Sequence, residues 1–213
     1  MKKLLVFDLD GTLIDSRRDL ARGLNLMRAH YGLHPLDYET ITSYVGNGAR
    51  KLVERSLGDA PQINIETALS VNNAFYRKHL VDENCLYAGI DAGLRAYLAA
   101  GHRLAVLANK PDEMTRMILT HFGITDLFEE IVGGGFETFA LKPDPASLNF
   151  LIDRSGLPKD RCWMIGDHYT DMAVAERAGI STIFCEYGIG ITGEHQPTHR
   201  IQAFSDLAAI FNV

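Results

Sequence analysis

Five short apolar runs recur along the chain, and each is followed by polar residues or glycine. The runs cover residues 4–7, 104–108, 131–132, 162–165 and 182–184. The longer ones are continuous rather than alternating, which is typical of parallel strands that are buried on both faces. We therefore predict a parallel sheet built from these five runs.

Helical patterns separate the predicted strands. Met114, Ile118 and Phe122, for example, share one helical face just before a glycine, and glycine is a common residue at helix C-termini. The glycines that follow such patterns are Gly101, Gly123, Gly156 and Gly179. Alternation of strands and helices predicts an α/β fold with a doubly wound, Rossmann-like sheet and right-handed crossovers.

Residues 16–83 break this rhythm, because they contain three helical stripes and no strand-like run. The stripes are Leu20, Leu24 and Met27, then Leu52, Val53 and Leu57, then Ala68, Val71 and Phe75. We predict an all-helical cap of residues 16–83, inserted into an α/β catalytic core of residues 1–15 and 84–213. Residues 188–198 are predicted as a surface loop and 204–211 as a short terminal helix.

The composition is that of an ordinary globular protein: 46% of its 213 residues are hydrophobic, 23% are charged and the formal net charge is −6. No basic block stands out, so nucleic acid is not an expected partner. No segment is long and apolar enough for a membrane span. The three cysteines lie far apart along the chain, which predicts reduced thiols and a cytoplasmic protein. We expect a monomer or a homodimer.

An acidic pair follows the first predicted strand. Asp8 and Asp10 lie one residue apart, directly after the apolar run of residues 4–7. Burial and a like charge nearby both raise the pKa of a carboxyl group. A cation such as Mg²⁺ relieves both penalties, because it takes oxygen ligands and leaves room for a substrate phosphate. The pair therefore predicts a metal-dependent phosphoryl-transfer site.

Polar side chains also follow the other predicted strands, where ligands of open α/β sheets bind. These are Asn109 and Lys110 after the second run, Lys142 beyond the third, and Asp167 and Asp171 after the fourth. A solvated loop or a helix cap would explain any one of them. Asp8, Asp10 and Asp167 together require a cation to balance their charge.

With these motifs the chain resembles the haloacid dehalogenase-like hydrolase superfamily, above all its phosphoglycolate phosphatase branch with a helical cap. The resemblance covers nearly the whole length. Residues 8–13 (DLDGTL) match the first motif, Lys142 in KPDP matches the third, and residues 166–171 (GDHYTD) match the fourth. In the predicted cap, residues 45–48 (VGNG) resemble a segment common in that branch.

The resemblance implies a Mg²⁺-dependent phosphatase of small phosphorylated metabolites, phosphoglycolate among them. Asp8 would be the nucleophile that forms an aspartyl-phosphate. Asp10 would protonate the leaving alcohol and then activate water. Mg²⁺ would be held by Asp8, by the main-chain carbonyl of Asp10 and by Asp167.

Other residues are implied to bind the phosphate or to support the nucleophile. Lys142 would neutralise the phosphate oxygens and Asp8. Asp171 would orient either a metal-bound water or Lys142. The backbone amides from Leu9 to Gly11 would donate further hydrogen bonds to the phosphate.

One position departs from the family pattern. The second motif usually ends its strand with Thr or Ser, whose hydroxyl binds the phosphate, but here Ala108 precedes Asn109. A hydrogen bond to a charged group is worth about 1.5–3 kcal/mol, so its loss slows turnover by roughly 10- to 150-fold unless another group replaces it. We expect the backbone N–H and the side chain of Asn109 to replace it in part.

The cap is expected to select the substrate. Arg17 and Arg50, with Arg18 and Lys51 beside them, are candidates for holding a substrate carboxylate, and a solvated helix face is the alternative interpretation. Other functions stay open. A phosphomutase of the same superfamily would use the same acidic pair, and a low-activity paralogue would only bind a phosphorylated metabolite. A dehalogenase needs no metal and would leave Lys142 and Asp167 unexplained.

Overall fold

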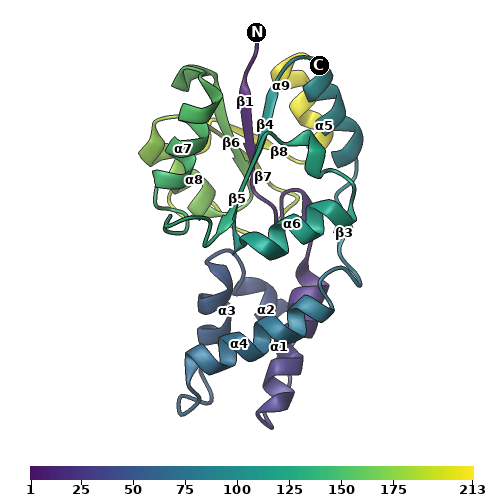
Figure 1. Cartoon of the computed structure of the whole chain (residues 1–213), viewed down its shortest axis with the longest axis vertical. Coiled ribbons are helices and arrows are strands. Elements are labelled where there is room, and N and C mark those ends of the chain that lie inside the picture. Colours follow the sequence, from purple (N-terminus) through teal and green to yellow (C-terminus); the bar gives the residue numbers. More distant parts are fainter.

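A six-stranded parallel sheet forms the core of the protein (Figure 1). The computed structural model describes residues 1–213. Across the sheet the strands are β5 (Glu130–Gly134), β4 (Arg103–Pro111), β1 (Leu4–Phe7), β6 (Cys162–Gly166), β7 (Ser181–Cys185) and β8 (His199–Ile201). The sheet and its flanking helices confirm the predicted doubly wound α/β fold, with β1 at the centre.

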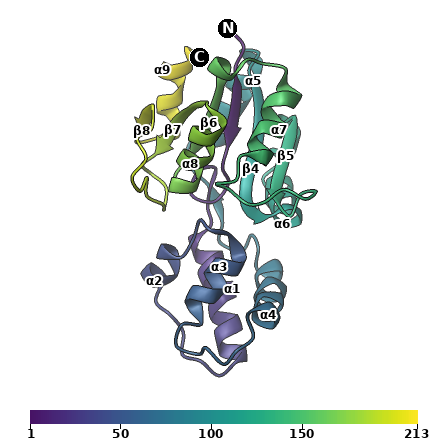
Figure 2. The same cartoon turned by 90° about the vertical axis from the view of Figure 1, so that its left-hand side faces the viewer.

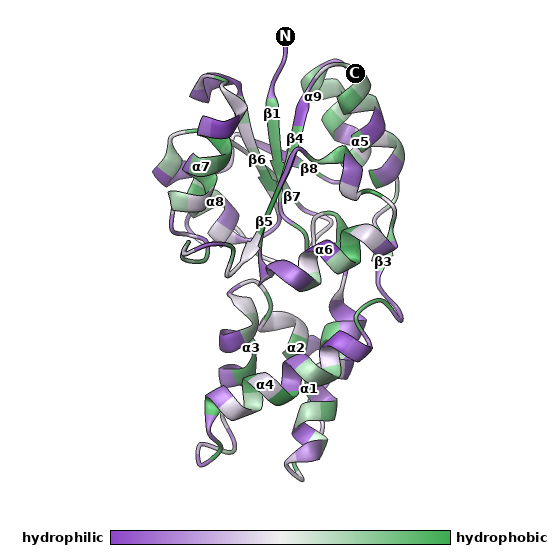
Figure 3. Ribbon diagram, in the orientation of Figure 1, coloured by the Kyte–Doolittle hydropathy of each residue, from purple (hydrophilic) through white to green (hydrophobic).

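Helices cover both faces of the sheet, which explains why the central stretches of its inner strands are hydrophobic (Figure 3). Successive side chains of a strand point to opposite faces. The helices are α5 (Ile90–Ala99), α6 (Asp112–His121), α7 (Ala146–Ser155), α8 (Tyr169–Ala178) and α9 (Leu207–Phe211). Leu5 and Phe7 pack in one hydrophobic cluster with α5, α6 and α9, whereas Leu4 and Val6 pack in another with α7 and α8. Short 3₁₀ turns are η1 (Thr125–Leu127), η2 (Lys159–Arg161) and η3 (Phe204–Asp206).

Four helices form a separate layer, the helical subdomain, beyond the carboxyl ends of the strands (Figure 2). They are α1 (Arg17–His30), α2 (Tyr38–Ser43), α3 (Gly48–Ser56) and α4 (Ile65–Lys78). Their interior holds a buried arginine, Arg28, whose guanidinium donates to Asp59 at 2.7 and 2.9 Å and to the carbonyl of His34 at 2.7 Å. A charge this deeply buried is tolerated because it is paired and hydrogen-bonded.

The two connections between the core and the helical subdomain pair with each other. Strand β2 (Ile14–Asp15) and strand β3 (Cys85–Leu86) form a two-stranded antiparallel sheet. Beside it, the buried carboxylate of Asp19 accepts the backbone N–H groups of Glu83 and Asn84 at 2.9–3.1 Å. The chain therefore enters and leaves the subdomain through one narrow neck. None of the helices is long and apolar enough to cross a lipid bilayer.

Candidate active site

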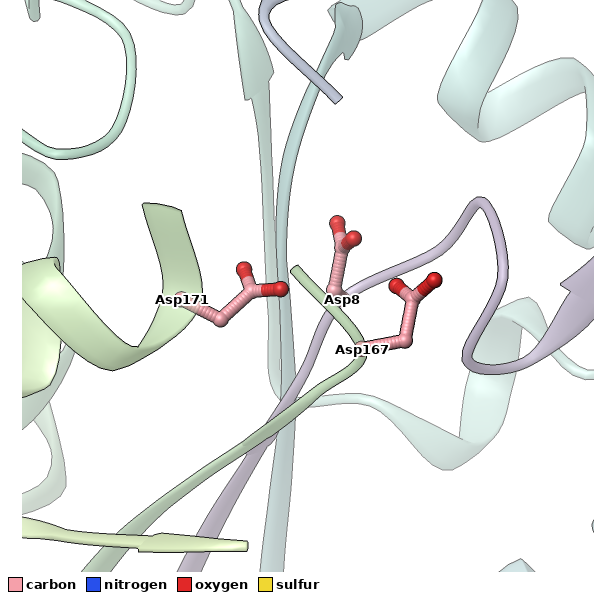
Figure 4. A group of neighbouring side chains, drawn as sticks. All are labelled: Asp8, Asp167 and Asp171. Atoms are coloured by element: carbon pink, nitrogen blue, oxygen red, sulfur yellow. The ribbon is translucent and has the colours of Figure 1, made fainter. Parts of the chain in front are cut away.

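Three carboxylates converge at the carboxyl edge of the sheet. Asp8 follows β1, Asp167 follows β6, and Asp171 lies in the first turn of α8. Their oxygens lie within 4.8 Å of one another, and all three residues are buried (Figure 4). The three carboxylates lie close together because β1 and β6 are neighbouring parallel strands that end at the same edge of the sheet.

One lysine compensates part of this negative charge. The Nζ atom of Lys142 lies 2.8 Å from Asp8 Oδ1 and 2.7 Å from Asp171 Oδ1, and it also donates to the carbonyl of Leu107 at 2.7 Å. The other oxygen of Asp171 accepts the backbone N–H of His168 at 3.0 Å, at the start of α8. Asp171 thus caps its helix and fixes Lys142 beside Asp8.

Burial controls the protonation of these groups. It raises the pKa of Asp8 well above its usual value despite Lys142, and Asp171 and Asp167 add to the rise. Burial and the nearby Asp171 raise the pKa of Asp167 to about 7. For Lys142, burial alone would lower the pKa, but Asp171 and Asp8 outweigh it and raise the pKa. The carboxylates are therefore short of positive charge.

Glycines make room for Asp167. A Cβ on Gly11, on Gly188 or on Gly190 would collide with Asp167, and Gly11 also has a φ of +85°, which glycine adopts without strain. The backbone N–H groups of Ile189 and Gly190 donate to Asp167 Oδ2 at 2.7 and 2.9 Å. The segment predicted as a plain surface loop therefore begins inside the site.

This donor set fits a divalent cation. Asp8 and Asp167 offer hard oxygen ligands, which Mg²⁺ and Ca²⁺ prefer over nitrogen or sulfur. Burial penalises both as anions, and only one lysine contacts the cluster of three acids. A bound cation would supply the missing positive charge.

A cavity lies between this cluster and the helical subdomain, and we call it the interdomain cavity. Its lining comes from both sides: Asp8, Asp10, Asn109, Lys110, Pro111 and Met114 from the core, and Leu20, Val45, Gly46, Gly48, Ala49, Leu52, Asn72, Asn73 and Tyr76 from the subdomain. The cavity is small, with a volume of about 50 Å³. It suits a substrate of few atoms.

Asp10 faces a second buried lysine in this cavity. Its Oδ1 lies 3.0 Å from Lys110 Nζ as an ion pair. The Lys110 ammonium also donates to the Tyr76 hydroxyl at 2.6 Å. Burial alone would lower the pKa of Lys110, but Asp10 and Tyr76 outweigh it and raise the pKa.

Two of the expected phosphate donors are occupied elsewhere. The Gly11 N–H donates to the carbonyl of Ile14 at 2.9 Å, whereas the Leu9 N–H has no backbone acceptor. The Asn109 side chain accepts the backbone N–H of Lys142 and donates to the carbonyls of Lys142 and Gly46, at 2.8–3.1 Å. In this structure the Asn109 side chain therefore has no free N–H for a phosphate, and its expected part in replacing the hydroxyl missing at Ala108 stays a prediction. That side chain instead clamps the Lys142 loop to the helical subdomain.

The expected cationic residues of the subdomain do not line the interdomain cavity. Arg17 pairs with Asp15 through contacts of 2.5 and 2.7 Å, close to the neck. Arg50 pairs with Glu66 on the subdomain surface. Asp15 lies only two residues from Arg17 in the sequence, whereas Glu66 lies 16 residues from Arg50 on another helix, where local sequence gives no sign of the pairing.

Sequence reasoning missed four groups of the site: the amides after β7, and the side chains of Asn72, Asn73 and Tyr76 on α4. The Gly188-Ile189-Gly190 segment directly after a strand was an available signal for the amides. No local signal marks the α4 residues, since a helical stripe looks the same whether it faces a core or a cavity.

A parallel α/β sheet with a buried carboxylate cluster at its carboxyl edge, beneath a helical subdomain, defines an enzyme of the α/β class built to hold a cation and a small anionic substrate. The sequence model of the haloacid dehalogenase-like hydrolases matches residues 5–185. The chain belongs to the haloacid dehalogenase-like hydrolase family.

Relatives extend over nearly the whole chain. A phosphoglycolate phosphatase from Colwellia psychrerythraea is 39% identical over 195 residues, which cover 88% of this chain and 85% of that protein. Another from Psychrobacter arcticus is 36% identical and covers 98% and 94% of the two chains. The crystal structure of a predicted phosphoglycolate phosphatase from Haemophilus somnus superposes with a TM-score of 0.92 at 30% identity, over 99% of this chain and 98% of the other. Within its family the protein is a phosphoric monoester hydrolase.

Proposed function

We propose that the protein is a Mg²⁺-dependent phosphatase of small phosphate monoesters that works through an aspartyl-phosphate, with 2-phosphoglycolate as its foremost candidate substrate. The observation that carries the proposal is the contact of Lys142 with both Asp8 and Asp171 beside a cation-deficient carboxylate cluster. The substrate is suggested by the phosphoglycolate phosphatases among the relatives.

In the first half of the reaction, an Asp8 carboxylate oxygen attacks phosphorus and the bond from phosphorus to the leaving oxygen breaks. Asp10 gives its proton to that oxygen, so the product leaves as an alcohol. Lys142 holds positive charge next to Asp8 and the transferring phosphoryl group. The free Leu9 N–H is available to a phosphate oxygen.

In the second half, Asp10 takes a proton from water, and the water oxygen attacks the phosphorus of the aspartyl-phosphate. Inorganic phosphate leaves, and Asp8 is restored. Asp8, the main-chain carbonyl of Asp10 and Asp167 would hold Mg²⁺, whose positive charge would reduce the repulsion between the phosphate oxygens and the anionic nucleophile. Residues 16–83 act as the cap that excludes bulk water.

Replacing the nucleophile tests this proposal. Asp8→Asn keeps the shape of the side chain but removes its nucleophilicity, so we expect the release of inorganic phosphate to fall by at least about 1,000-fold. The amide needs no counter-charge, so the thermal unfolding midpoint should not fall. Phosphate release is measured over a panel of metabolite esters with and without EDTA. Hydrolysis that survives in Asp8→Asn would overturn the mechanism.

A further inference from the structure

Lys110 is the only cationic side chain that lines the interdomain cavity. It comes from the end of β4 and is only 6% exposed. Its ammonium lies over the Tyr76 ring, 4.5 Å from the centroid, in addition to its contacts with the Tyr76 hydroxyl and Asp10. A buried ammonium facing a cavity is positioned to receive an anion.

A second polar group points into the same space without a partner. Asn72 lines the cavity and is only 4% exposed, yet its amide makes no hydrogen bond within the chain. It lies one turn before Tyr76 on α4, and residues four apart share one face of a helix. Asn72 and Tyr76 therefore present an amide and a hydroxyl beside Lys110.

The surrounding cations are not available for this role. Arg18 pairs with Glu83 and Lys51 with Glu54 on the subdomain surface, and Arg77 pairs with Glu113 of α6 in the core. Lys142, on the other side of the site, already contacts two carboxylates. A second anionic group of a substrate, apart from the phosphate, would meet Lys110.

The position of Lys110 limits what it can bind. Because it touches Asp10, whose proposed role is at the leaving oxygen, it reaches only groups on carbon atoms close to that oxygen. A single lysine in a small cavity matches one negative charge, as on a carboxylate, better than a second phosphate.

We propose that Lys110, Tyr76 and Asn72 form a carboxylate subsite that selects phosphate monoesters of short hydroxy acids. This inference rests on the proposed function, since it concerns the leaving-group side of the same reaction. Lys110 would bind the substrate carboxylate directly, while Tyr76 and Asn72 would offer further hydrogen-bond donors. The specificity would thus come from the core and α4 rather than from the arginines of α1 and α3.

The test compares two substrates of similar length, 2-phosphoglycolate and 2-hydroxyethyl phosphate, which differ in the carboxylate. For Lys110→Met we expect KM for 2-phosphoglycolate to rise by about 10- to 150-fold, the value of a hydrogen bond to a charged group. Any effect that acts through Asp10 is common to both esters, so the ratio of KM for 2-phosphoglycolate to KM for 2-hydroxyethyl phosphate is the readout, and it should rise by about 10-fold or more. The matched control is Lys78→Met, which removes an exposed lysine of α4 and should change neither KM.

Asn72→Asp provides a second variant that leaves Lys110 in place. The added negative charge should raise KM for 2-phosphoglycolate and lower KM for 2-aminoethyl phosphate, whose cation it would attract. Circular dichroism verifies that both variants fold. The subsite is excluded if each variant changes KM for 2-phosphoglycolate and KM for its comparison ester equally, or if neither variant changes any KM. The phosphatase proposal stands in both cases. If the wild-type protein hydrolyses none of the three esters, the proposed function fails first.

Discussion

At the residue scale, Ala108 places a methyl group near the end of β4, where the family pattern has a hydroxyl. It follows Val106 by two positions, and Val106 pairs with Phe7, the residue before Asp8. Its side chain is buried, and the neighbouring Asn109 amide is fully committed to Lys142 and Gly46. No side chain next to Ala108 along the strand replaces the missing donor.

We therefore expect Ala108→Thr to raise kcat/KM for phosphate esters by about 10-fold or more, because a hydroxyl adds a hydrogen bond to the charged phosphoryl group. Ala108→Val is the matched control, since valine has the shape of threonine without the hydroxyl. Steady-state kinetics on p-nitrophenyl phosphate measure both. An equal response of the two variants would show that packing, not hydrogen bonding, governs this position.

The gathering of acids at the site could be predicted from the sequence, whereas the binding role of the cavity could not. Asp8, Asp167 and Lys142 follow strands, and parallel strands bring such residues to one edge. Lys110 lies at the end of β4, but its partner Tyr76 comes from a helix 34 positions earlier. The pairing of Arg50 with Glu66 likewise depends on how α3 packs against α4. Tertiary pairing of this kind leaves no local pattern.

At the element scale, the apolar runs predicted the longer strands of the core, whereas the shortest strands were not predicted from the sequence. Strands β2 and β3 have two residues each, and β8 has three, of which only Ile201 is buried. A strand needs several residues before its periodicity can be recognised. These short strands form because the neck and the sheet edge hold them in place.

The turn between α5 and β4 contains a pH-sensitive contact. His102 Nδ1 accepts the backbone N–H of Lys3 at 3.2 Å, which requires that this nitrogen carry no proton. Burial, with Lys3 and the N-terminus nearby, lowers the pKa of His102 below its usual value. A lowered histidine pKa means that its contribution to stability is present above the unfolded pKa of about 6.5 and is lost as the pH falls through the folded pKa.

We expect the unfolding midpoint of the wild type to fall between about pH 7.5 and pH 5, and to fall less in His102→Gln. Glutamine keeps an acceptor for the Lys3 N–H but does not titrate. Thermal unfolding followed by circular dichroism gives the two curves. Parallel pH profiles would mean that other groups account for the acid sensitivity.

At the scale of the whole molecule, the helical subdomain contacts the core through residues 45–48. The Asn47 amide donates to the Tyr169 hydroxyl at 2.6 Å, and Gly46 approaches the His168 ring so closely that a Cβ would lie 2.5–2.7 Å from its atoms. Gly46 also has a φ of +113°. Glycine is required here by space and by backbone conformation together.

Gly46→Ala should lower kcat/KM by about 5- to 150-fold, because the added methyl group disfavours this contact between the helical subdomain and the core by about 1–3 kcal/mol. Gly32→Ala is a suitable control. Gly32 also has a positive φ, of +71°, but a Cβ added to it would meet no atom within 4 Å. Steady-state kinetics on 2-phosphoglycolate compare the two. Equal losses in both variants would attribute the effect to backbone strain alone.

Cation binding should stabilise the whole molecule, because Lys142 is the only cationic side chain that contacts the three carboxylates of the site. At about 100 times its dissociation constant, Mg²⁺ should raise the unfolding midpoint by about 5–10 °C. Asp167→Asn should abolish the rise, while its own midpoint without Mg²⁺ should be at least that of the wild type. Scanning calorimetry with and without EDTA measures both, and a full Mg²⁺ response in the variant would remove Asp167 from the ligand set.

The neck formed by β2 and β3 also bears on how such proteins diversify. Because Ile14 pairs with Leu86 and Asp15 with Cys85, the two ends of the inserted segment are adjacent. A segment whose ends are adjacent can be exchanged for one of another length without a change in the strand order of the sheet, because the closure of a longer loop costs little extra entropy. The pairing thus makes the helical subdomain an interchangeable module. Its sequence and length can change while the carboxylates at the strand ends stay in place.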